Sequence, residues 1–415
     1  MAPAPHLAQL RLTTLTSDRV EEFMTAALRG FHQDYDADAA EAARGVLEPE
    51  RFFGLTAEDR WVATCGAYTR VMTVPGGTVP TAAVSYVTVS PAYRRRGLLN
   101  QMMTHQLTGL AEGGEPVALL WASEDSIYGR YGYGAATPIL HLEGRTQETA
   151  FRSDVDLGTG SVGEVDAAEC RRVVEPLHAR LLPERPGALN RPSAWWDAVF
   201  QDHPSRRNGA TAARYALHYD ATGQPDGYLT FRLSSVATAD PGPGLTVRVA
   251  ALDAADLRGY ARLWRFVLDL DLARHFEGVA ALDEPLRYLV ADSRSVRSRF
   301  TDGTYVRLVD VPRALESRRY PVDVDLVLGI RDALLPQNSG SFRLQGGPAG
   351  ASVRRVPTTP DVELDVRELA TLYLAGTPAA ALHRAGLVQE RTAGYMAALD
   401  AGFSWPRLPY CRDYF

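Results

Sequence analysis

The sequence predicts an α+β fold, in which a meander of strands is followed by alternating helices and strands. Residues 51–56, 60–74 and 80–89 are rich in β-branched and aromatic residues, which is typical of antiparallel strands. The tripeptide Pro75-Gly-Gly77 predicts a tight turn between the last two. Apolar residues recur at helical spacing from Leu98 to Leu110. We therefore expect an α+β layer within about the first 145 residues, an ordinary domain size.

Composition narrows the class of protein. The chain has 415 residues, of which 46% are hydrophobic and 23% are charged, as in an ordinary globular protein of two to four domains. The formal net charge of −6 argues against nucleic acid as the main partner. The sequence contains no lysine, so all 44 basic residues are arginines. Schiff-base and P-loop lysine chemistry are therefore excluded.

Metal and membrane signals are missing from the sequence. The three cysteines, Cys65, Cys170 and Cys411, are too few and too scattered for a disulfide framework or a paired-cysteine zinc site. The nine histidines form no HExxH pair. No uncharged apolar run approaches the roughly 18 residues of a spanning helix, and the N-terminus has no signal-peptide pattern. We expect a cytoplasmic protein with no metal and no membrane partner.

The segment 84–110 is the main candidate for a binding site. A predicted strand ends at Val89, the basic turn Arg94-Arg-Arg-Gly97 follows, and a helix begins near Leu98. The unpaired N–H groups and the positive end of that helix favour an anion, and glycine allows close approach of a phosphate. The turn is neither a P-loop nor a G-x-G-x-x-G fingerprint. From spacing alone, a phosphate site and a solvated arginine turn both remain open.

The chain divides into three predicted domains, residues 1–153, 154–303 and 304–415. A strand at 135–142 is expected to end the first. Residues 154–163 contain a literal G-x-G-x-x-G, but the preceding stretch is too short and acidic for a buried strand, so they are interpreted as a flexible linker. The second domain repeats the order of the first without an Arg-Arg-x-Gly turn, which suggests a duplicated fold without a cofactor site.

Further elements are expected in the second and third domains. A helix over 167–182 should be kinked or broken at Pro176, and Pro241-Gly-Pro-Gly244 should form a hairpin loop. In the third domain a strand is expected at 305–309. The C-terminus contains two prolines, two tyrosines, a tryptophan and a terminal Phe415, which is not a solvated composition. We expect this end to be extended and docked.

Three segments resemble the Eis (enhanced intracellular survival) family of actinobacterial N-acetyltransferases. They are residues 87–99, Ala122-Ser-Glu-Asp-Ser-Ile-Tyr-Gly-Arg-Tyr-Gly-Tyr-Gly134 and the terminal Phe415. The turn resembles the acyl-CoA pyrophosphate motif of the GNAT superfamily, although Leu99 replaces the usual small residue. The resemblance implies tandem GNAT and GNAT-like domains followed by a sterol-carrier-protein-like domain. It also implies a homo-hexamer that uses acetyl-CoA to acetylate aminoglycoside amines.

The resemblance assigns roles to individual residues. It implies that Tyr128 donates a proton and that the carboxylate of Phe415 is the general base. The acetyl-CoA site that it implies consists of Val87, Thr88, Val89, Arg95, Arg96, Gly97, Leu98, Leu99, Asn100, Ser123 and Glu124. From the residues alone, Tyr128 is also consistent with a packed aromatic in a glycine-rich loop, and Phe415 with a hydrophobic plug.

The expected chemistry is compatible with these roles. An amine must lose a proton to attack a thioester, and the departing thiolate must gain one. An α-carboxylate is ionised at neutral pH, whereas a tyrosine hydroxyl keeps its proton. A polycationic substrate favours carboxylates and aromatic faces. The candidates for such a pocket are Asp34, Asp36, Glu124, Asp125 and Asp413, with Phe31, Tyr35, Trp61 and Tyr414 as walls.

Two other functions remain open from the sequence. The same cofactor site serves acetylation of a lysine, a peptide or another small amine. A non-catalytic lipid-binding or assembly protein would carry the motif only as a relic, but the intact Arg95-Arg-Gly97 turn together with Tyr128 argues against this.

Overall fold

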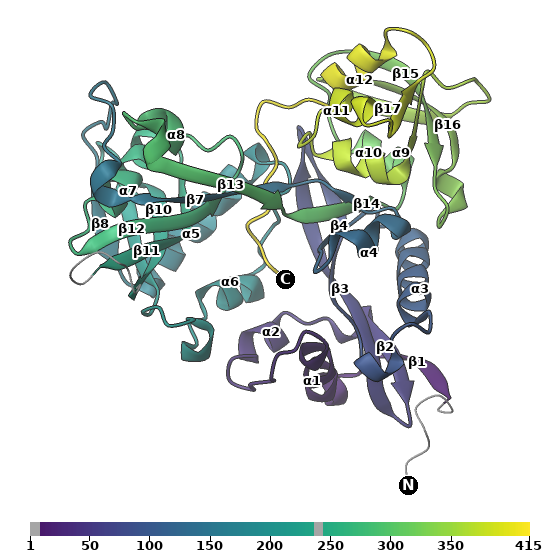
Figure 1. Cartoon of the computed structure of the whole chain (residues 1–415), viewed down its shortest axis with the longest axis horizontal. Helices are drawn as coiled ribbons and strands as arrows, with labels where there is room; N and C mark the ends of the chain where they lie inside the picture. Colours follow the sequence, from purple (N-terminus) through teal and green to yellow (C-terminus); the bar gives the residue numbers. More distant parts are fainter. Residues whose placement is uncertain (1–8, 236–243) are drawn as a thin grey trace. The chain divides into compact units, whose positions relative to one another are not determined.

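The computed structural model describes residues 9–235 and 244–415, which form two compact units (Figure 1). One unit contains the chain up to Thr137 together with Pro183–Arg191 and Gly303–Phe415. The other contains Pro138–Leu182 and Pro192–Asp302. In the described ranges, no helix combines the length and the apolar character that crossing a bilayer requires.

The N-terminal part of the first unit is an α+β layer, as predicted. Its elements are β1 (Leu10–Thr14), α1 (Val20–Gly30), α2 (Glu41–Gly45), β2 (Phe52–Ala57), β3 (Arg60–Val74), β4 (Gly77–Val89), α3 (Leu98–Gly113), β5 (Val117–Trp121), α4 (Asp125–Tyr128) and β6 (Gly134–Ala135). With β14 (Thr304–Leu308) the strands form a sheet in the order β1-β2-β3-β4-β5-β14-β6. The apolar face of α3, including Met102, Met103 and Leu107, packs on this sheet.

The C-terminal part of the first unit has a sheet of its own, in the order β17-β16-β15-β18-β19. Its elements are α9 (Val311–Glu316), β15 (Val324–Arg331), β16 (Gly340–Gly347), β17 (Gly350–Arg355), β18 (Val362–Asp365), α10 (Val366–Tyr373), α11 (Ala379–Arg384), β19 (Val388–Glu390) and α12 (Tyr395–Gly402). The helices α9, α10 and α12 are amphipathic and bury residues such as Leu315, Leu369 and Leu399.

The second unit is also built on one sheet, in the order β13-β7-β12-β11-β10-β9-β8. Its elements are β7 (Pro138–Arg145), β8 (Ser161–Val165), α5 (Ala167–Leu181), α6 (Ser193–Phe200), β9 (Arg214–Tyr219), β10 (Pro225–Ser235), β11 (Leu245–Ala254), α7 (Leu257–Leu268), β12 (Ala273–Ala280), α8 (Leu286–Leu289) and β13 (Val296–Asp302). Its core includes Phe231, Leu263, Trp264 and Phe276.

The strand expected at 135–142 is in fact two strands that join different sheets. β6 pairs with β14 in the first sheet, whereas β7 pairs with β12 and β13 in the second. The N–H groups of Ala136 and Thr137 both donate to the carbonyl of Thr304, and Pro138 has no N–H to continue a ladder. The sequence between the two strands therefore interrupts the pairing, and partners far along the chain complete each sheet.

Two further expectations are corrected in the second unit. The predicted linker 154–163 is held in place, because Arg258 pairs with Asp156 and Arg262 donates to the carbonyls of Leu157 and Gly158. Its last residues belong to β8, which pairs with β9. The predicted break at Pro176 is wrong, because α5 runs as one helix from Ala167 to Leu181 with one face packed against the second unit's core. The alternative, a kink at Pro176, stays a prediction. The predicted hairpin loop Pro241–Gly244 lies almost wholly outside the described residues.

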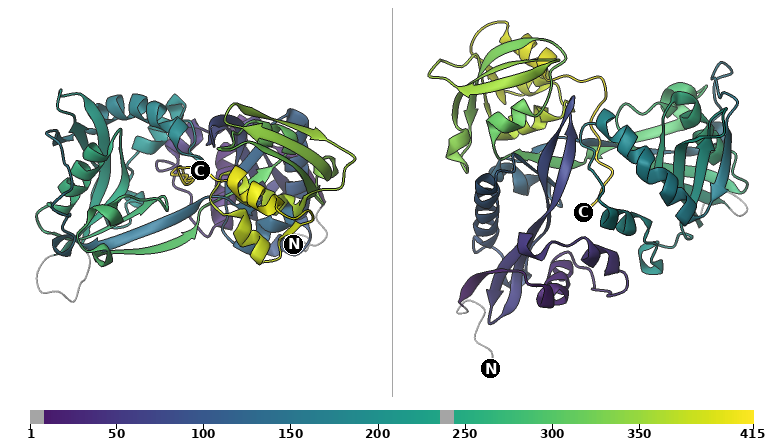
Figure 2. Two further views of the ribbon diagram at one scale, coloured as in Figure 1. Left: turned by 90° about the horizontal axis from the view of Figure 1, so that it is seen from above. Right: turned by 180° about the vertical axis from the view of Figure 1, so that it is seen from behind.

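The C-terminal tail is extended and docked, as predicted (Figure 2). The backbone N–H of Tyr410 donates to the carbonyl of Pro186 at 2.9 Å, and the guanidinium of Arg185 donates to the carbonyl of Leu408 at 2.7 Å. Tyr410, Cys411 and Asp413 are buried, whereas Tyr414 is 80% exposed. Burial of these three side chains and the two backbone contacts explain why this polar-aromatic end is docked on the protein.

A buried ion pair joins β14 to the C-terminal sheet. Arg307 donates from Nη2 to both carboxylate oxygens of Asp332, at 2.8 and 2.7 Å, and both side chains are essentially inaccessible to solvent. Asp332 also accepts from the backbone N–H groups of Leu334 and Leu335 and from the side chain of Asn338. Removing one partner of such a pair leaves an uncompensated buried charge.

We predict that Arg307→Met lowers the thermal unfolding midpoint by about 5–10 °C, the result of losing roughly 3–5 kcal/mol. Differential scanning calorimetry of the full chain measures the shift. The matched control is Arg343→Met, which breaks a half-exposed pair with Asp325 and should change the midpoint by about 2 °C or less. Equal shifts for the two variants would show that the buried pair contributes no more to the free energy of unfolding than the half-exposed pair does.

Candidate active site

Strands β4 and β5 separate part of the way along their length. Their parallel pairing covers only Thr81–Val84 and Val117–Leu120. Residues 85–89 of β4 continue to pair with β3 on one side only, and β5 pairs on its other side with β14. The separation leaves one edge of β4 without a ladder partner among the described strands. An extended ligand can pair with an edge of this kind.

A β-bulge lies in the separated part of β4. Tyr86 has φ +52°, and the register with β3 shifts between Thr64 and Gly66. The Thr64 hydroxyl donates to the carbonyl of Tyr86 at 2.7 Å and lies 2.8 Å from the hydroxyl of Thr88. Bulges re-aim the backbone next to binding sites, and this one is held by a side chain of the neighbouring strand.

The structure places the candidate β4 residues on both faces of the sheet. The side chain of Thr88 is buried against Thr64 and Gly30, so it is not available to a ligand. Val87 and Val89 are partly buried and pack against the core under α3. Any contact of these residues with a ligand must therefore come mainly from the backbone.

The basic turn leads directly into α3. Arg95 and Gly97 have φ values of +62° and +78°, and the N–H of Gln101 donates to the carbonyl of Gly97 as the first bond of the helix. The N–H groups of Leu98, Leu99 and Asn100 come before this bond and therefore have no acceptor within the helix. A β-carbon built on Gly97 would meet no atom within 4 Å, so the positive φ rather than crowding requires glycine here.

The side chains of the turn differ in what they offer. Arg94 donates to the carbonyl of Val89, and Arg96 donates to the carbonyl of Ala92 while its guanidinium covers the ring of Tyr93. Arg95 and Asn100 are exposed, Leu99 is partly buried, and the side chain of Leu98 is in the core. The turn thus combines two positive φ positions, free helix N–H groups and exposed positive charge, a combination that favours an anion.

Tyr128 ends the short helix α4 and is 6% exposed. Its ring lies edge-on to Tyr133 with centroids 5.9 Å apart. Burial raises the pKa of the Tyr128 hydroxyl well above its usual value, and the charge of Glu124 acts in the same direction. The hydroxyl therefore keeps its proton throughout the neutral range.

The neighbours of Tyr128 have different surroundings. Tyr133 is fully buried, and its hydroxyl has no hydrogen-bond partner in the described chain. Ser123 and Glu124 lie exposed on the loop between β5 and α4. Asp125, which we considered for a cation pocket, accepts a hydrogen bond from the Tyr305 hydroxyl at 2.6 Å.

The C-terminal tail lies against the end of β5. The indole N–H of Trp121 donates to the carbonyl of Asp413 at 2.9 Å, and the ring of Tyr414 lies 5.6 Å from the Trp121 ring. Phe415 follows directly and is partly exposed. The chain continues from Trp121 through Ser123 and Glu124 to Tyr128. The C-terminal tail therefore contacts the end of β5, and the segment that leads to Tyr128 begins at that same strand end.

Asp413 anchors this tail. Its Oδ1 accepts from Nε of Arg191 at 2.7 Å and lies 3.6 Å from Nη2 of Arg70, and all three side chains are at most 6% exposed. Sequence reasoning proposed Asp413 for substrate binding, but its carboxylate is occupied by arginines. Arg70 was not identified, although it is the lone charge in the otherwise uncharged run from Trp61 to Val74.

One expected wall of a cation pocket is also corrected. Trp61 is 8% exposed, packs edge-on against Phe23 at 5.2 Å between ring centroids, and is covered by the guanidinium of Arg19. It belongs to the core under α1. Phe31 and Asp34 remain exposed.

Comparisons with known proteins agree with this architecture. Family models described as acetyltransferase (GNAT) domains match residues 11–136 and 187–308, and a sterol carrier protein domain matches residues 311–412. The chain is therefore a tandem of two GNAT domains followed by a sterol-carrier-protein-like domain, as the sequence predicted.

Individual relatives identify the family. The chain is 33% identical to the N-acetyltransferase Eis of Mycobacterium tuberculosis (strain H37Ra) over 80% of both chains. It is 38% identical to a Streptomyces avermitilis protein described as an uncharacterized N-acetyltransferase, over 88% of this chain and 89% of that protein. The crystal structure of Eis1 from Mycobacterium abscessus matches with a TM-score of 0.84 at 32% identity, covering 98% of this chain and all of that one. The chain belongs to the Eis family of GNAT N-acetyltransferases.

Proposed function

We propose that this chain transfers the acetyl group of acetyl-CoA to amines of aminoglycosides. In this proposal Tyr128 is the proton donor and the α-carboxylate of Phe415 is the proton acceptor. The observation that carries the proposal is the docking of the tail on Trp121, because it brings the C-terminus to the strand end from which the Tyr128 segment begins.

The residues between Val87 and Asn100 fit acetyl-CoA. The free edge of β4 offers backbone groups to the amides of the pantetheine arm. The turn from Arg95 to Asn100 offers helix N–H groups and positive charge to the pyrophosphate. In this proposal Ser123 and Glu124, which follow the end of β5, lie beside the acetyl-CoA. When bound, acetyl-CoA supplies the thioester that the amine attacks.

The chain's own residues handle the protons. The carboxylate of Phe415 accepts a proton from the attacking amine, and the hydroxyl of Tyr128 donates one to the departing sulfur, so that charge is balanced as the amide forms. The raised pKa of Tyr128 keeps that proton available up to alkaline pH. A base and an acid that arrive from different segments of the chain can lie on opposite sides of the reacting centre.

The substrate class is supported by the family and by charge. The chain carries a net charge of −6, and Glu124 lies exposed on the loop between β5 and α4. Negative potential attracts polycationic amines. Acetylation of peptides, lysine side chains or other small amines uses the same acetyl-CoA site, so a substrate panel separates these activities.

We predict that one glycine added after Phe415 abolishes acetylation, because it moves the terminal carboxylate by about 3.5 Å. The assay is thiol release from acetyl-CoA with a panel of aminoglycosides. The unfolding midpoint and CoA affinity of the extended chain should match those of the intact chain. Equal turnover by both chains would place the base elsewhere, with Glu124 the first alternative. Release by the intact chain only with peptides or polyamines would overturn the aminoglycoside assignment.

We predict that Tyr128→Phe lowers kcat by about 10²–10⁴-fold, the usual contribution of a positioned acid. The matched control is Tyr133→Phe, which removes a hydroxyl that has no partner in the described chain and should change kcat by less than about twofold. The two tyrosines pack together, so a purely structural effect would appear in both variants. Similar kcat values for Tyr128→Phe and the wild type would exclude Tyr128 as the acid.

We predict that Asp413→Asn releases the tail, because it leaves the buried guanidinium groups of Arg70 and Arg191 without their carboxylate. Carboxypeptidase should remove only the residues after Asp413 from the native chain, and should continue past Cys411 in the variant. Arg407→Gln, which breaks an exposed pair with Glu184, is the control and should digest like the native chain. Identical digestion of all three chains would contradict the anchoring role.

A further inference from the structure

A cavity of about 390 Å³ lies in the first unit, between the segment that follows Tyr128 and the sterol-carrier-protein-like domain. Its volume is within the range of small-molecule sites. None of the residues assigned above to acetyl-CoA lines it. The lining residues are Gly129, Arg130, Tyr131, Gly132, Arg331, Asp332, Ala333, Leu334, Asp365, Val366, Arg367, Glu368, Gly386 and Leu387.

Two arginines in this lining are available to a ligand. The side chains of Arg130 and Arg331 are exposed, and neither guanidinium forms a hydrogen bond or an ion pair within residues 9–235 and 244–415. They come from different domains, Arg130 from the segment after α4 and Arg331 from the end of β15. Guanidinium groups bind carboxylate and phosphate oxygens through paired N–H donors.

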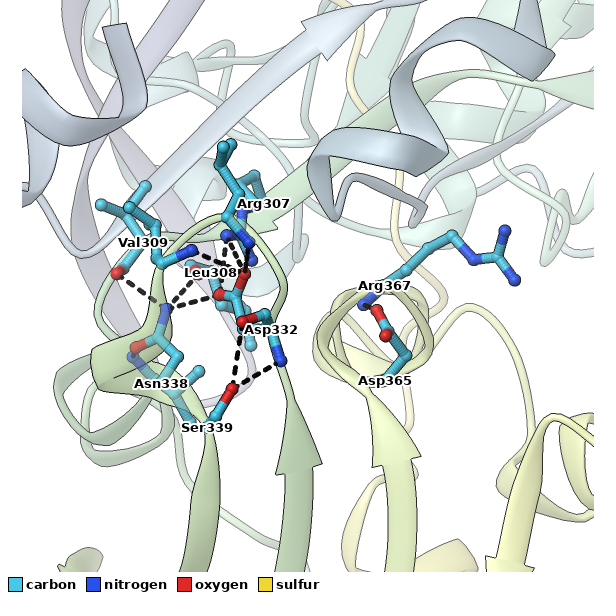
Figure 3. Close-up of polar contacts among 11 residues, drawn as sticks. Arg307, Leu308, Val309, Asp332, Asn338, Ser339, Asp365 and Arg367 are labelled. Atoms are coloured by element: carbon cyan, nitrogen blue, oxygen red, sulfur yellow. Dashed lines mark hydrogen bonds and ion pairs between the residues drawn. The ribbon is translucent and has the colours of Figure 1, made fainter. Parts of the chain in front are cut away.

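Two of the three carboxylates of the lining, those of Asp332 and Glu368, are paired with arginines that compensate their negative charge. Asp332 is bonded by Arg307, by Asn338 and by two backbone N–H groups (Figure 3). Glu368 is 5% exposed and is paired with Arg367 at 2.6 Å. Asp365 caps α10 by accepting the N–H of Arg367, as Figure 3 also shows.

A third guanidinium, that of Arg307, lies behind the wall; its charge is compensated by Asp332, but two of its nitrogens have no acceptor among the residues that the structure describes. Nε and Nη1 of Arg307 are buried without a hydrogen-bond partner in the described residues. Nη1 would lie 2.7 Å from a β-carbon built on Gly132, and Val366 is equally close to that position. Arg307 therefore lies directly behind Gly132 and Val366, two residues of the lining.

Apolar side chains complete the cavity. Leu334, Val366 and Leu387 line it together with Tyr131. Leu387 is 40% exposed, so a ligand that covered it would bury apolar surface. We propose that this cavity binds a small organic anion, a carboxylate or phosphate ester with a short apolar body. The proposal does not depend on the acetyl-transfer function.

The test is isothermal titration calorimetry of the full chain with benzoate and with phenyl phosphate, in the presence of saturating CoA so that the basic turn of residues 94–97 is occupied. At least one probe should bind with a Kd on the order of 1 mM or below, as expected for ligands of this size. Benzamide and benzylamine, which keep the ring but lack the negative charge, should show no binding at the same concentrations. Preference for benzoate or for phenyl phosphate distinguishes a carboxylate ligand from a phosphate ligand.

The double variant Arg130→Gln with Arg331→Gln locates the site. It should weaken binding of the better probe by about tenfold or more, since each charge-assisted hydrogen bond contributes roughly 1.5–3 kcal/mol. The control Arg354→Gln removes an exposed arginine of β17 that is not in the lining, and it should bind the probe like the native chain. No binding of either anion, equal binding of benzamide, or unchanged affinity in the double variant would overturn the proposal.

Discussion

The docked C-terminal tail depends on one buried carboxylate. Asp413 lies between Arg191 and Arg70, and its backbone carbonyl accepts from the indole of Trp121. A charge in a nearly dry site is stable only when its partners are fixed, so this contact determines where the last two residues lie. The proposed catalytic role of the α-carboxylate is possible only if the chain end is held by such an interaction, because a terminal residue is otherwise poorly ordered.

A buried ion pair also lies at the junction of the first GNAT domain and the sterol-carrier-protein-like domain. β14 follows the second unit in sequence but pairs with β5 and β6, and Arg307 on this strand binds Asp332 of the C-terminal domain. The first sheet is therefore completed by a strand about 180 residues away. The segment after Tyr128 packs on this junction, which explains why a cavity with a charged wall forms immediately beside the proposed proton donor.

Much of the fold could be predicted because local patterns were strong. The strands 51–56, 60–74 and 80–89 and the helix from Leu98 agree with β2, β3, β4 and α3 to within a few residues. The prediction of one strand at 135–142 was wrong, because the division of this segment between two sheets depends on Thr304 and on partners distant in sequence. The prediction of a flexible linker at 154–163 was wrong because Arg258 and Arg262, about 100 residues further on, hold this segment.

By itself the sequence determined the order strand, basic glycine turn and helix, and the family resemblance that the relatives confirm. These are properties of neighbouring residues, so local chemistry is sufficient to define them. Only the tertiary structure decided that Asp413 is an anchor rather than a substrate contact, that Trp61 is core, and that Arg130 and Arg331 face one cavity. Those outcomes depend on which charges and rings meet after folding, because burial and long-range pairing decide the role of a polar side chain.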